Sequence, residues 1–159
     1  MIPPEANAEF VCQMEDVLNV YERPYDPENP VICMDEMSKQ LVKEVINPVP
    51  ARSGDIEKYD YHYERNGTRN LFMFTEPLKG FRWVKVTDRR TKLDWARAMK
   101  ELAEIHYPKA DKMTVVMDNL NTHKRESFYE AFEPDKARSL INRFDFHYTP
   151  VHGSWLDMA

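Results

Sequence analysis

The sequence predicts an α/β protein whose mixed sheet places antiparallel hairpin strands beside parallel strands, with helices covering its faces. Two short apolar runs, at 31–34 and 113–117, have the composition of strands buried on both faces. Between them, the runs at 71–75 and 81–87 flank a five-residue turn, which is typical of an antiparallel hairpin. Helical patterns separate the later strands, and this alternation favours parallel pairing.

The composition is that of a soluble globular domain. The chain has 159 residues, of which 42% are hydrophobic and 31% charged, and no apolar run approaches the roughly 20 residues that a membrane span requires. No leader for export is recognised, so we expect a cytoplasmic protein with no membrane partner. Cys12 and Cys33 lack metal-binding spacing, and we expect both to be reduced core thiols.

The first thirty residues differ in character from the rest. Apolar side chains recur at helical spacing over 9–22, and Pro24, Pro27 and Pro30 then form a stiff polar linker. We therefore divide the chain into an N-terminal helix with its Pro-rich linker, residues 1–30, and a catalytic domain, residues 31–159. The helix is either a packing element of that domain or a connector, and its acidity and flanking prolines favour the connector.

The segment after the first strand is the least regular part of the sequence. Residues 38–46 form either a short helix or an extended connection, and 51–70 are polar and turn-rich, with the strongest turn signal at 65–68. The alternation of Tyr59, Tyr61 and Tyr63 indicates a strand edge with one aromatic face.

The second half of the chain alternates helices and strands. Thr91 and Asp94 have the spacing of a capping box, and Trp95, Met99 and Leu102 then form one apolar stripe of a helix. The remaining expected elements are a helix at 123–132 capped by Asn121 or Thr122, a helix at 134–142, a strand at 144–149 and the beginning of a helix at 154–159.

Each of the two buried strands delivers an aspartate at its exit, Asp35 from the first and Asp118 from the second. Open α/β sheets bind ligands at the carboxyl ends of strands, so we expect one site with paired carboxylates. Two carboxylates in one site repel each other unless cations lie between them. Mg²⁺ takes oxygen ligands and accepts phosphate oxygens, so the pattern predicts a two-metal site for phosphoryl chemistry, occupied by Mg²⁺ or Mn²⁺.

The charge distribution weakens the objection that a net charge of −5 raises against a nucleic-acid partner. Residues 1–36 hold nine acids and one base, so the remaining residues carry a net charge of +3. A run at 79–92 contains one acid and six bases, which are a candidate footprint for DNA phosphates: Lys79, Arg82, Lys85, Arg89, Arg90 and Lys92. A solvated hairpin face explains the run equally well.

Three sequence blocks together resemble one known family. CMDE at 33–36, MDNLNTH at 117–123 and YTPVHGSWLDMA at 148–159 look like the signature blocks of insertion-sequence transposases of the Tc/mariner superfamily. These are DDE-type enzymes of bacteria and archaea with a ribonuclease H-like core, and YERNGTRNLF at 63–72 resembles their hairpin region. The resemblance covers roughly residues 31–159 and matches the order of elements expected above.

The resemblance implies roles for individual residues. Asp35 and Asp118 correspond to the first two catalytic acids and metal ligands. Asn119 and Trp155 match accessory positions, while His123 and His152 are candidate DNA contacts. The implied partner is DNA, as transposon ends and target, with a possible homodimer and no small-molecule cofactor.

The chain departs from the family at its end, because the third block of the family continues into a third acid and this sequence stops at Ala159. We therefore expect a catalytic domain truncated before that acid and inactive by itself in metal-dependent strand cleavage and transfer. Asp157 stands where Asn is common and is an alternative source of a carboxylate. Two other functions stay open: a non-catalytic DNA-binding or subunit-interaction remnant, and a stand-alone ribonuclease H-like nuclease.

Several candidate residues have a second, structural interpretation. His123 either steers the second acid, contacts a phosphate or is a surface group, and His152 is alternatively a turn histidine packed on the indole of Trp155. Trp83 and the three tyrosines can stack bases or cover the sheet. Glu36 should point to the face opposite Asp35 and is not expected to be a ligand.

Overall fold

The structure, a computed structural model, describes residues 7–159 apart from 60 and 121 and confirms the α/β class with a mixed sheet. The five strands are ordered β3-β2-β1-β4-β5. The antiparallel part contains β1 (Val31–Glu44), β2 (Tyr63–Glu76) and β3 (Phe81–Thr87), and the parallel part adds β4 (Met113–Met117) and β5 (Phe144–Tyr148) beside β1. Strands β3 and β4 lie where the sequence indicates, and β5 is one residue shorter than expected. Strands β1 and β2 are much longer than the apolar runs at 31–34 and 71–75 that predicted them.

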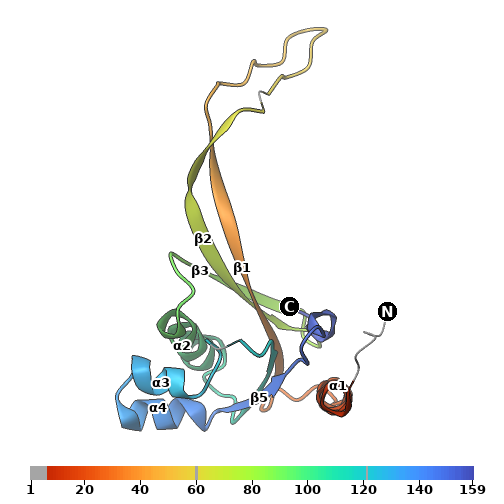
Figure 1. The fold of residues 1–159 in the computed structure, drawn as a ribbon, viewed down its shortest axis with the longest axis vertical. Helices are drawn as coiled ribbons and strands as arrows, with labels where there is room; N and C mark the ends of the chain where they lie inside the picture. Colours follow the sequence, from red (N-terminus) through yellow and green to blue (C-terminus); the bar gives the residue numbers. More distant parts are fainter. Residues whose placement is uncertain (1–6, 60, 121) are drawn as a thin grey trace.

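Helices cover both faces of the sheet (Figure 1). One face carries α2 (Lys92–Glu101), a π turn η1 (Leu102–His106), α3 (Glu126–Ala131) and α4 (Pro134–Ile141), which enclose the larger core around Trp95, Phe72 and Phe128. The other face carries α1 (Ala8–Tyr21) and the 3-10 turn η2 (Ser154–Leu156). No helix in the described part of the chain has the length and apolarity to span a membrane.

Helix α1 is a packing element rather than the connector that its charge and prolines favour. Val17 and Val20 are fully buried and form the smaller core with Cys33, Val116 and Leu156. The Tyr21 hydroxyl donates a hydrogen bond of 2.7 Å to the carbonyl of Leu156. The acidic side chains of α1 lie on its solvent-exposed face. Its acidity is therefore compatible with packing on the domain through the opposite, apolar face.

One cysteine differs from expectation. Cys33 is buried on β1 as predicted, whereas Cys12 is exposed on α1. The helical stripe of α1 buries residues 10, 17 and 20, and position 12 falls on the opposite side of the helix.

Strands β1 and β2 continue beyond the body of the protein as a two-stranded arm, here defined as residues 39–69 (Figure 1). The extended alternative for residues 38–46 is therefore the right one. The turn expected at 65–68 is wrong, because these residues lie within β2 and the reversal occurs at 45–62. Gly67 has a φ of +86°, and the pairing shifts register opposite it between Gln40 and Val42, so the glycine serves a β-bulge.

The helix starts were predicted with mixed success. The capping box is confirmed: Asp94 N–H donates to the Thr91 hydroxyl at 3.3 Å, and Thr91 N–H donates to the Asp94 carboxylate at 3.0 Å. The helix expected from residue 123 begins only at Glu126, without a side-chain cap. Thr122 does not cap the helix with its side chain; its backbone carbonyl accepts a hydrogen bond from the Ser127 hydroxyl. Asn121 lies outside the described residues. The helix expected at 154–159 is a single turn.

Candidate active site

Asp35 and Asp118 occupy neighbouring places on two adjacent parallel strands. Only Asp118 follows the end of its strand, whereas Asp35, expected at a strand exit, lies inside β1, just past the stretch that pairs with β4. In the register between β1 and β4, Cys33 pairs with Val116 and Met34 with Met117, so the next residues on the two strands are the two aspartates. Cys33 and Val116 belong to the smaller core beneath α1, and residues two positions along a strand share a face. Both carboxyl groups therefore emerge on the α1 face, at strands about 4.8 Å apart.

A third carboxyl group, that of Asp157, joins this pair from the C-terminal turn. The turn is tight at Gly153, where a Cβ atom would lie 2.5 Å from Cγ of Pro150, and its buried residue Leu156 belongs to the same small core as Cys33 and Val116. This packing brings Asp157 close to Asp35 and Asp118, whose charges act on its carboxyl group. Burial, with the negative charges of Asp35 and Asp118, raises the pKa of Asp157 from 3.8 to about 7. Sequence reasoning weighed this residue only as an alternative.

His123 lies directly behind Asp118. Its ring is completely buried, with Nδ1 2.8 Å from Oδ1 of Asp118 and Nε2 3.4 Å from Oε2 of Glu36. Burial lowers the pKa of His123, but the two carboxylates outweigh it and raise that pKa to about 9. The ring is therefore an imidazolium at neutral pH. Because it is buried, the ring is not placed to contact DNA, and its contact with Asp118 is compatible with the steering role that the sequence left as an alternative.

The contact of Glu36 with His123 was not foreseen from the sequence. As expected, Glu36 points to the face opposite Asp35, but its side chain is only 4% exposed and contacts His123 and Arg90, whose Nη1 is 3.1 Å from Oε1. Because side chains alternate along β1, Asp35 points toward the site and Glu36 points toward His123 on the opposite face of the sheet. No sequence signal marks Glu36 beyond its position next to Asp35.

The donor atoms present suit a hard divalent cation. Oδ2 of Asp157 is a buried carboxylate oxygen without a hydrogen-bond partner, the Asp118 side chain is 33% exposed although its Oδ1 is buried against His123, and Asp35 is exposed. Oxygen ligands of this kind are those that Mg²⁺ and Mn²⁺ take. Within residues 7–159, leaving out 60 and 121, no three His, Cys, Asp or Glu side chains are already arranged around one metal position.

The sequence over residues 30–159 matches the family described as the DDE superfamily endonucleases. The chain belongs to this family. No curated protein matches it. Among solved structures, the Mos1 transposase paired-end complex with left transposon end is similar, with a TM-score of 0.53 and 11% sequence identity over 92% of this chain and 44% of that one. This similarity supports the ribonuclease H-like fold that the family resemblance implies.

A second Mos1 structure, the mariner paired-end complex with Mn, matches with a TM-score of 0.47 at 12% identity, over 92% of this chain and 44% of that chain. The chain thus spans less than half the length of the Mos1 chains that it resembles.

The basic run of this DDE superfamily domain does not form one continuous surface. Burial alternates along β3, so that Arg82 lies on the uncovered face and Lys85 on the face beneath α2 and η1. Four of the six bases are in ion pairs: Lys79 with Glu76, Lys85 with Glu101, Arg90 with Glu36 and Lys92 with Glu130. Fewer than six of the predicted bases are therefore available together for DNA phosphates. The reasons are that successive side chains of a strand point to opposite faces and that four of the bases already have acidic partners.

Arginines from other segments extend what remains of this footprint. Arg89 lines a surface hollow together with Arg69 from β2 and Arg97 from α2, with Asp88 and Asp94 also in its wall. Asp88 lies 3.1 Å from Arg69, so part of this positive charge is neutralised. Only the folded chain brings these three arginines together.

The remaining predicted site residues of the endonuclease domain are on the surface. Asn119 is exposed just after Asp118. Trp155 is 60% exposed, and His152 is exposed with a φ of +65°, the only non-glycine residue with positive φ in the described chain. Trp83 stacks on Phe74 at a centroid distance of 4.9 Å, which favours its structural interpretation over base stacking.

Proposed function

We propose that this chain is the catalytic domain of an insertion-sequence transposase of the Tc/mariner superfamily, which cuts and joins DNA strands with Mg²⁺ or Mn²⁺. The observation that carries this proposal is the placement of Asp35, inside β1, beside Asp118, directly after β4, on one face of the sheet. Membership of the DDE superfamily endonucleases supports the same chemistry. The activity belongs to the whole protein, of which this chain corresponds to less than half in the Mos1 comparison.

In this proposal Asp35 and Asp118 hold the cations, and Asp157 lies beside them. Cations held by these carboxylates would supply charge stabilisation for an in-line displacement at phosphorus. The protein contributes orientation: the parallel pairing of β1 and β4 fixes the two carboxylates relative to each other, and His123 holds Asp118 from behind. Rigid strands are better suited to this task than loops.

DNA is the proposed substrate and partner. Arg82 and Arg89 have no ion-pair partner among the described residues, and with Arg69 and Arg97 they offer charge to phosphates. Trp155 and His152 lie on the C-terminal turn that also presents Asp157, so exposed side chains next to the acids are available to contact a bound strand.

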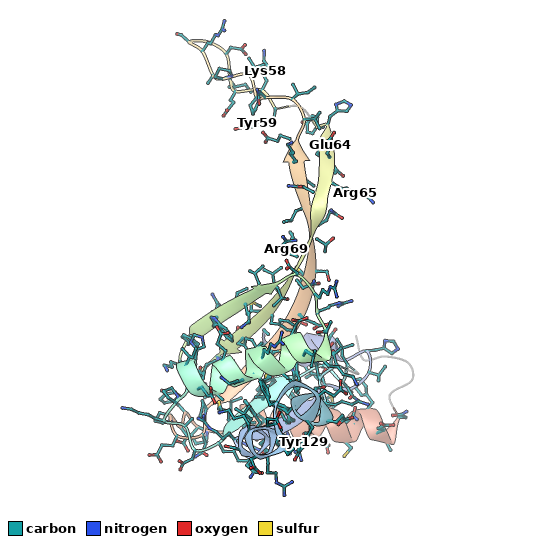
Figure 2. The ribbon with its side chains drawn as sticks, turned by 90° about the vertical axis from the view of Figure 1, so that its left-hand side faces the viewer. Lys58, Tyr59, Glu64, Arg65, Arg69 and Tyr129 are labelled. Atoms are coloured by element: carbon teal, nitrogen blue, oxygen red, sulfur yellow. The ribbon has the colours of Figure 1, made fainter. Side chains whose placement is uncertain are left out.

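The arm favours a second candidate function, contact with another subunit. Seven large apolar or aromatic side chains near its tip are more than half exposed: Val45, Ile46, Val49, Ile56, Tyr59, Tyr61 and Tyr63. Figure 2 shows Lys58 and Tyr59 near the tip, far from Tyr129 on the body. An extension this apolar is typical of an interaction element. In the possible homodimer, the arm would contact the second subunit. Such a contact is compatible with catalysis by the same protein.

The test of the proposed function is direct binding of Mn²⁺, followed by electron paramagnetic resonance of the free ion. We expect the chain to bind Mn²⁺ and the variants Asp35→Asn and Asp118→Asn to lose most of this binding, because each removes an anionic ligand. Asp145→Asn, a strand aspartate paired with His147 instead, is the matched control and should bind normally. Mn²⁺ binding that is absent, or unchanged in both site variants, would contradict the proposal.

A further inference from the structure

Four side chains form a continuous line from the surface to Asp118. Arg90 contacts Glu36 at 3.1 Å, Glu36 contacts His123 at 3.4 Å, and His123 contacts Asp118 at 2.8 Å. They come from three segments that are distant in sequence: β1, the connection between β3 and α2, and the loop after β4. The line therefore exists only in the folded protein.

The two central groups of this line are costly to bury. The His123 ring has no exposed surface and the Glu36 side chain is 4% exposed. His123 also faces the indole of Trp95, with ring centroids 5.7 Å apart, in a core that is otherwise apolar. Buried ion pairs contribute little to stability compared with apolar side chains of the same volume. A contribution to the site explains the presence of these groups better than a contribution to folding does.

We propose that His123 and Glu36 are positioning residues for Asp118, an inference that rests on the proposed function. His123 holds the buried Oδ1 of Asp118, and Glu36, itself fixed by Arg90, holds the opposite edge of the His123 ring.

The geometry explains how this arrangement orients the carboxylate. Complete burial and ion-pair contacts at both nitrogens restrict rotation of the imidazole ring, so the ring restrains Asp118 through its Oδ1 atom. The Asp118 side chain is still 33% exposed although Oδ1 is buried, so the rest of the carboxylate remains accessible for a cation. Groups behind a metal ligand commonly change metal affinity by about 10–100-fold when they are removed.

Strand β1 thereby contributes to the site from both of its faces. Asp35 offers its carboxylate on the α1 face, and the next residue, Glu36, acts on the α2 face through His123. Two consecutive residues of β1 thus supply one proposed ligand and restrain the other, Asp118, which follows β4.

The experiment measures Mn²⁺ affinity in the full chain for the variants His123→Gln, Glu36→Gln and Arg90→Gln. We expect Mn²⁺ affinity to fall about tenfold in His123→Gln, less in Glu36→Gln and least in Arg90→Gln, following the order of the contacts. The double variant of Glu36 and His123 should lose no more affinity than His123→Gln alone, because both residues act through the same contact to Asp118.

The chain provides a matched control for each central residue. His147 also lies between two carboxylates, 2.7 Å from Asp16 and 3.4 Å from Asp145, but it does not contact the site. Glu76 is also a buried strand glutamate, 2% exposed and paired with Lys79. His147→Gln and Glu76→Gln should therefore reduce thermal stability without changing Mn²⁺ affinity.

The outcomes separate the two levels of the proposal. If Asp118→Asn abolishes Mn²⁺ binding while His123→Gln and Glu36→Gln bind as well as their controls, the positioning role is overturned and the proposed function stands. If Asp118→Asn binds normally, both fail. Should His123→Gln not fold, Glu36→Gln and Arg90→Gln decide, and unchanged affinity in both overturns the inference.

Discussion

At the scale of single residues, neighbouring charges set the protonation of two groups at the site. His123 is kept positive by two carboxylates, and Asp157 is kept partly neutral by burial and by two other acids. The raised pKa values favour the charged form of His123 and the neutral form of Asp157. Each residue type titrates differently in water, so these states are properties of the site and not of the residues.

The first prediction concerns Asp157→Asn in a chelating buffer. The pKa of Asp157 is raised from 3.8 to about 7, so folding favours the protonated form of this side chain. The contribution of protonated Asp157 to the free energy of unfolding is therefore fully present below pH 3.8 and is lost as the pH rises through 7. The neutral Asn avoids this loss. We expect the variant to match the wild type near pH 4 and to exceed it at pH 8, by at most about 4 kcal/mol.

Urea unfolding at several pH values tests this prediction. The backbone N–H of Ala159 donates to Oδ1 of Asp157 at 2.9 Å, a contact that the Asn side-chain oxygen preserves. A stability difference that does not grow with pH would show that Asp157 is not destabilised by its neighbours.

The second prediction distinguishes the two cysteines. Burial raises the pKa of Cys33 to about 11, although the hydroxyl of Tyr21 at 3.5 Å lowers it in part, whereas Cys12 is exposed. Iodoacetamide at pH 8 should modify one thiol of the native protein, Cys12, and both thiols in urea, because the thiolate is the reactive form. Intact-mass measurements follow the reaction, and rapid double modification of the native protein would contradict the burial of Cys33.

At the scale of elements, the long hairpin of β1 and β2 shows that a turn-like sequence can form a β-bulge inside a strand. Gly67 supplies the positive φ that a turn requires, but it lies inside β2, where it accommodates a bulge. The pairing of β1 with β2 resumes beyond the bulge as far as Glu44 and Tyr63. The arm therefore extends well past the body, with isolated bridges at its tip between Val49 and Lys58 and between Arg52 and Asp55.

The third prediction is that limited trypsin treatment cuts the arm first, after Arg52 and Lys58. Both residues are exposed in irregular backbone, and the ion pair of Lys58 with Asp55 is exposed and weak. Arg97 and Lys100 in α2 are the internal controls, because helical backbone resists cleavage. Mass spectrometry identifies the fragments, and cleavage in α2 at the rate of the arm would refute the prediction.

At the scale of the whole molecule, the sheet is covered unequally. Helix α1 and the C-terminal turn cover the β1, β4 and β5 side of one face, while the β3 and β2 side of that face is open. Met37, Val84 and Val86 are exposed there, beside partly exposed Leu71 and Met73. Apolar surface left in water contributes nothing to stability.

The fourth prediction follows from this open face. We expect the chain to be marginally stable, with a melting temperature no higher than about 65 °C, the upper end of the usual mesophile range. Differential scanning calorimetry measures the transition. A cooperative transition well above that temperature would show that the open face costs little.

The fifth prediction concerns catalysis by this chain alone. The described residues hold two adjacent acids and a third that is partly protonated at neutral pH, and they form no ready three-group metal site. We expect weak or undetectable nicking of supercoiled plasmid DNA with Mg²⁺ or Mn²⁺. Nicking at a substantial rate that Asp118→Ala abolishes would contradict this expectation, and salt-dependent DNA binding without cleavage would agree with it.

The sequence alone determined the presence of the buried strands, the turn between β2 and β3, the capping box at Thr91 and the closeness of Asp35 and Asp118. These features depend on local signals, namely apolar runs and turn residues, whereas the full length of β1 and β2 was not visible in them. The stripe of α1 was also visible, but not the surface against which it packs.

Only the tertiary structure decided the roles of Glu36, His123 and Asp157 and the separation of the basic residues. Glu36 and Arg90 are far apart in sequence and come within 3.1 Å of each other, and Asp157 is brought to the acids by the packing of Leu156. The physical reason is that a residue's charge and exposure depend on the neighbours that long-range packing supplies, whereas a strand or helix is indicated by the spacing of its own side chains.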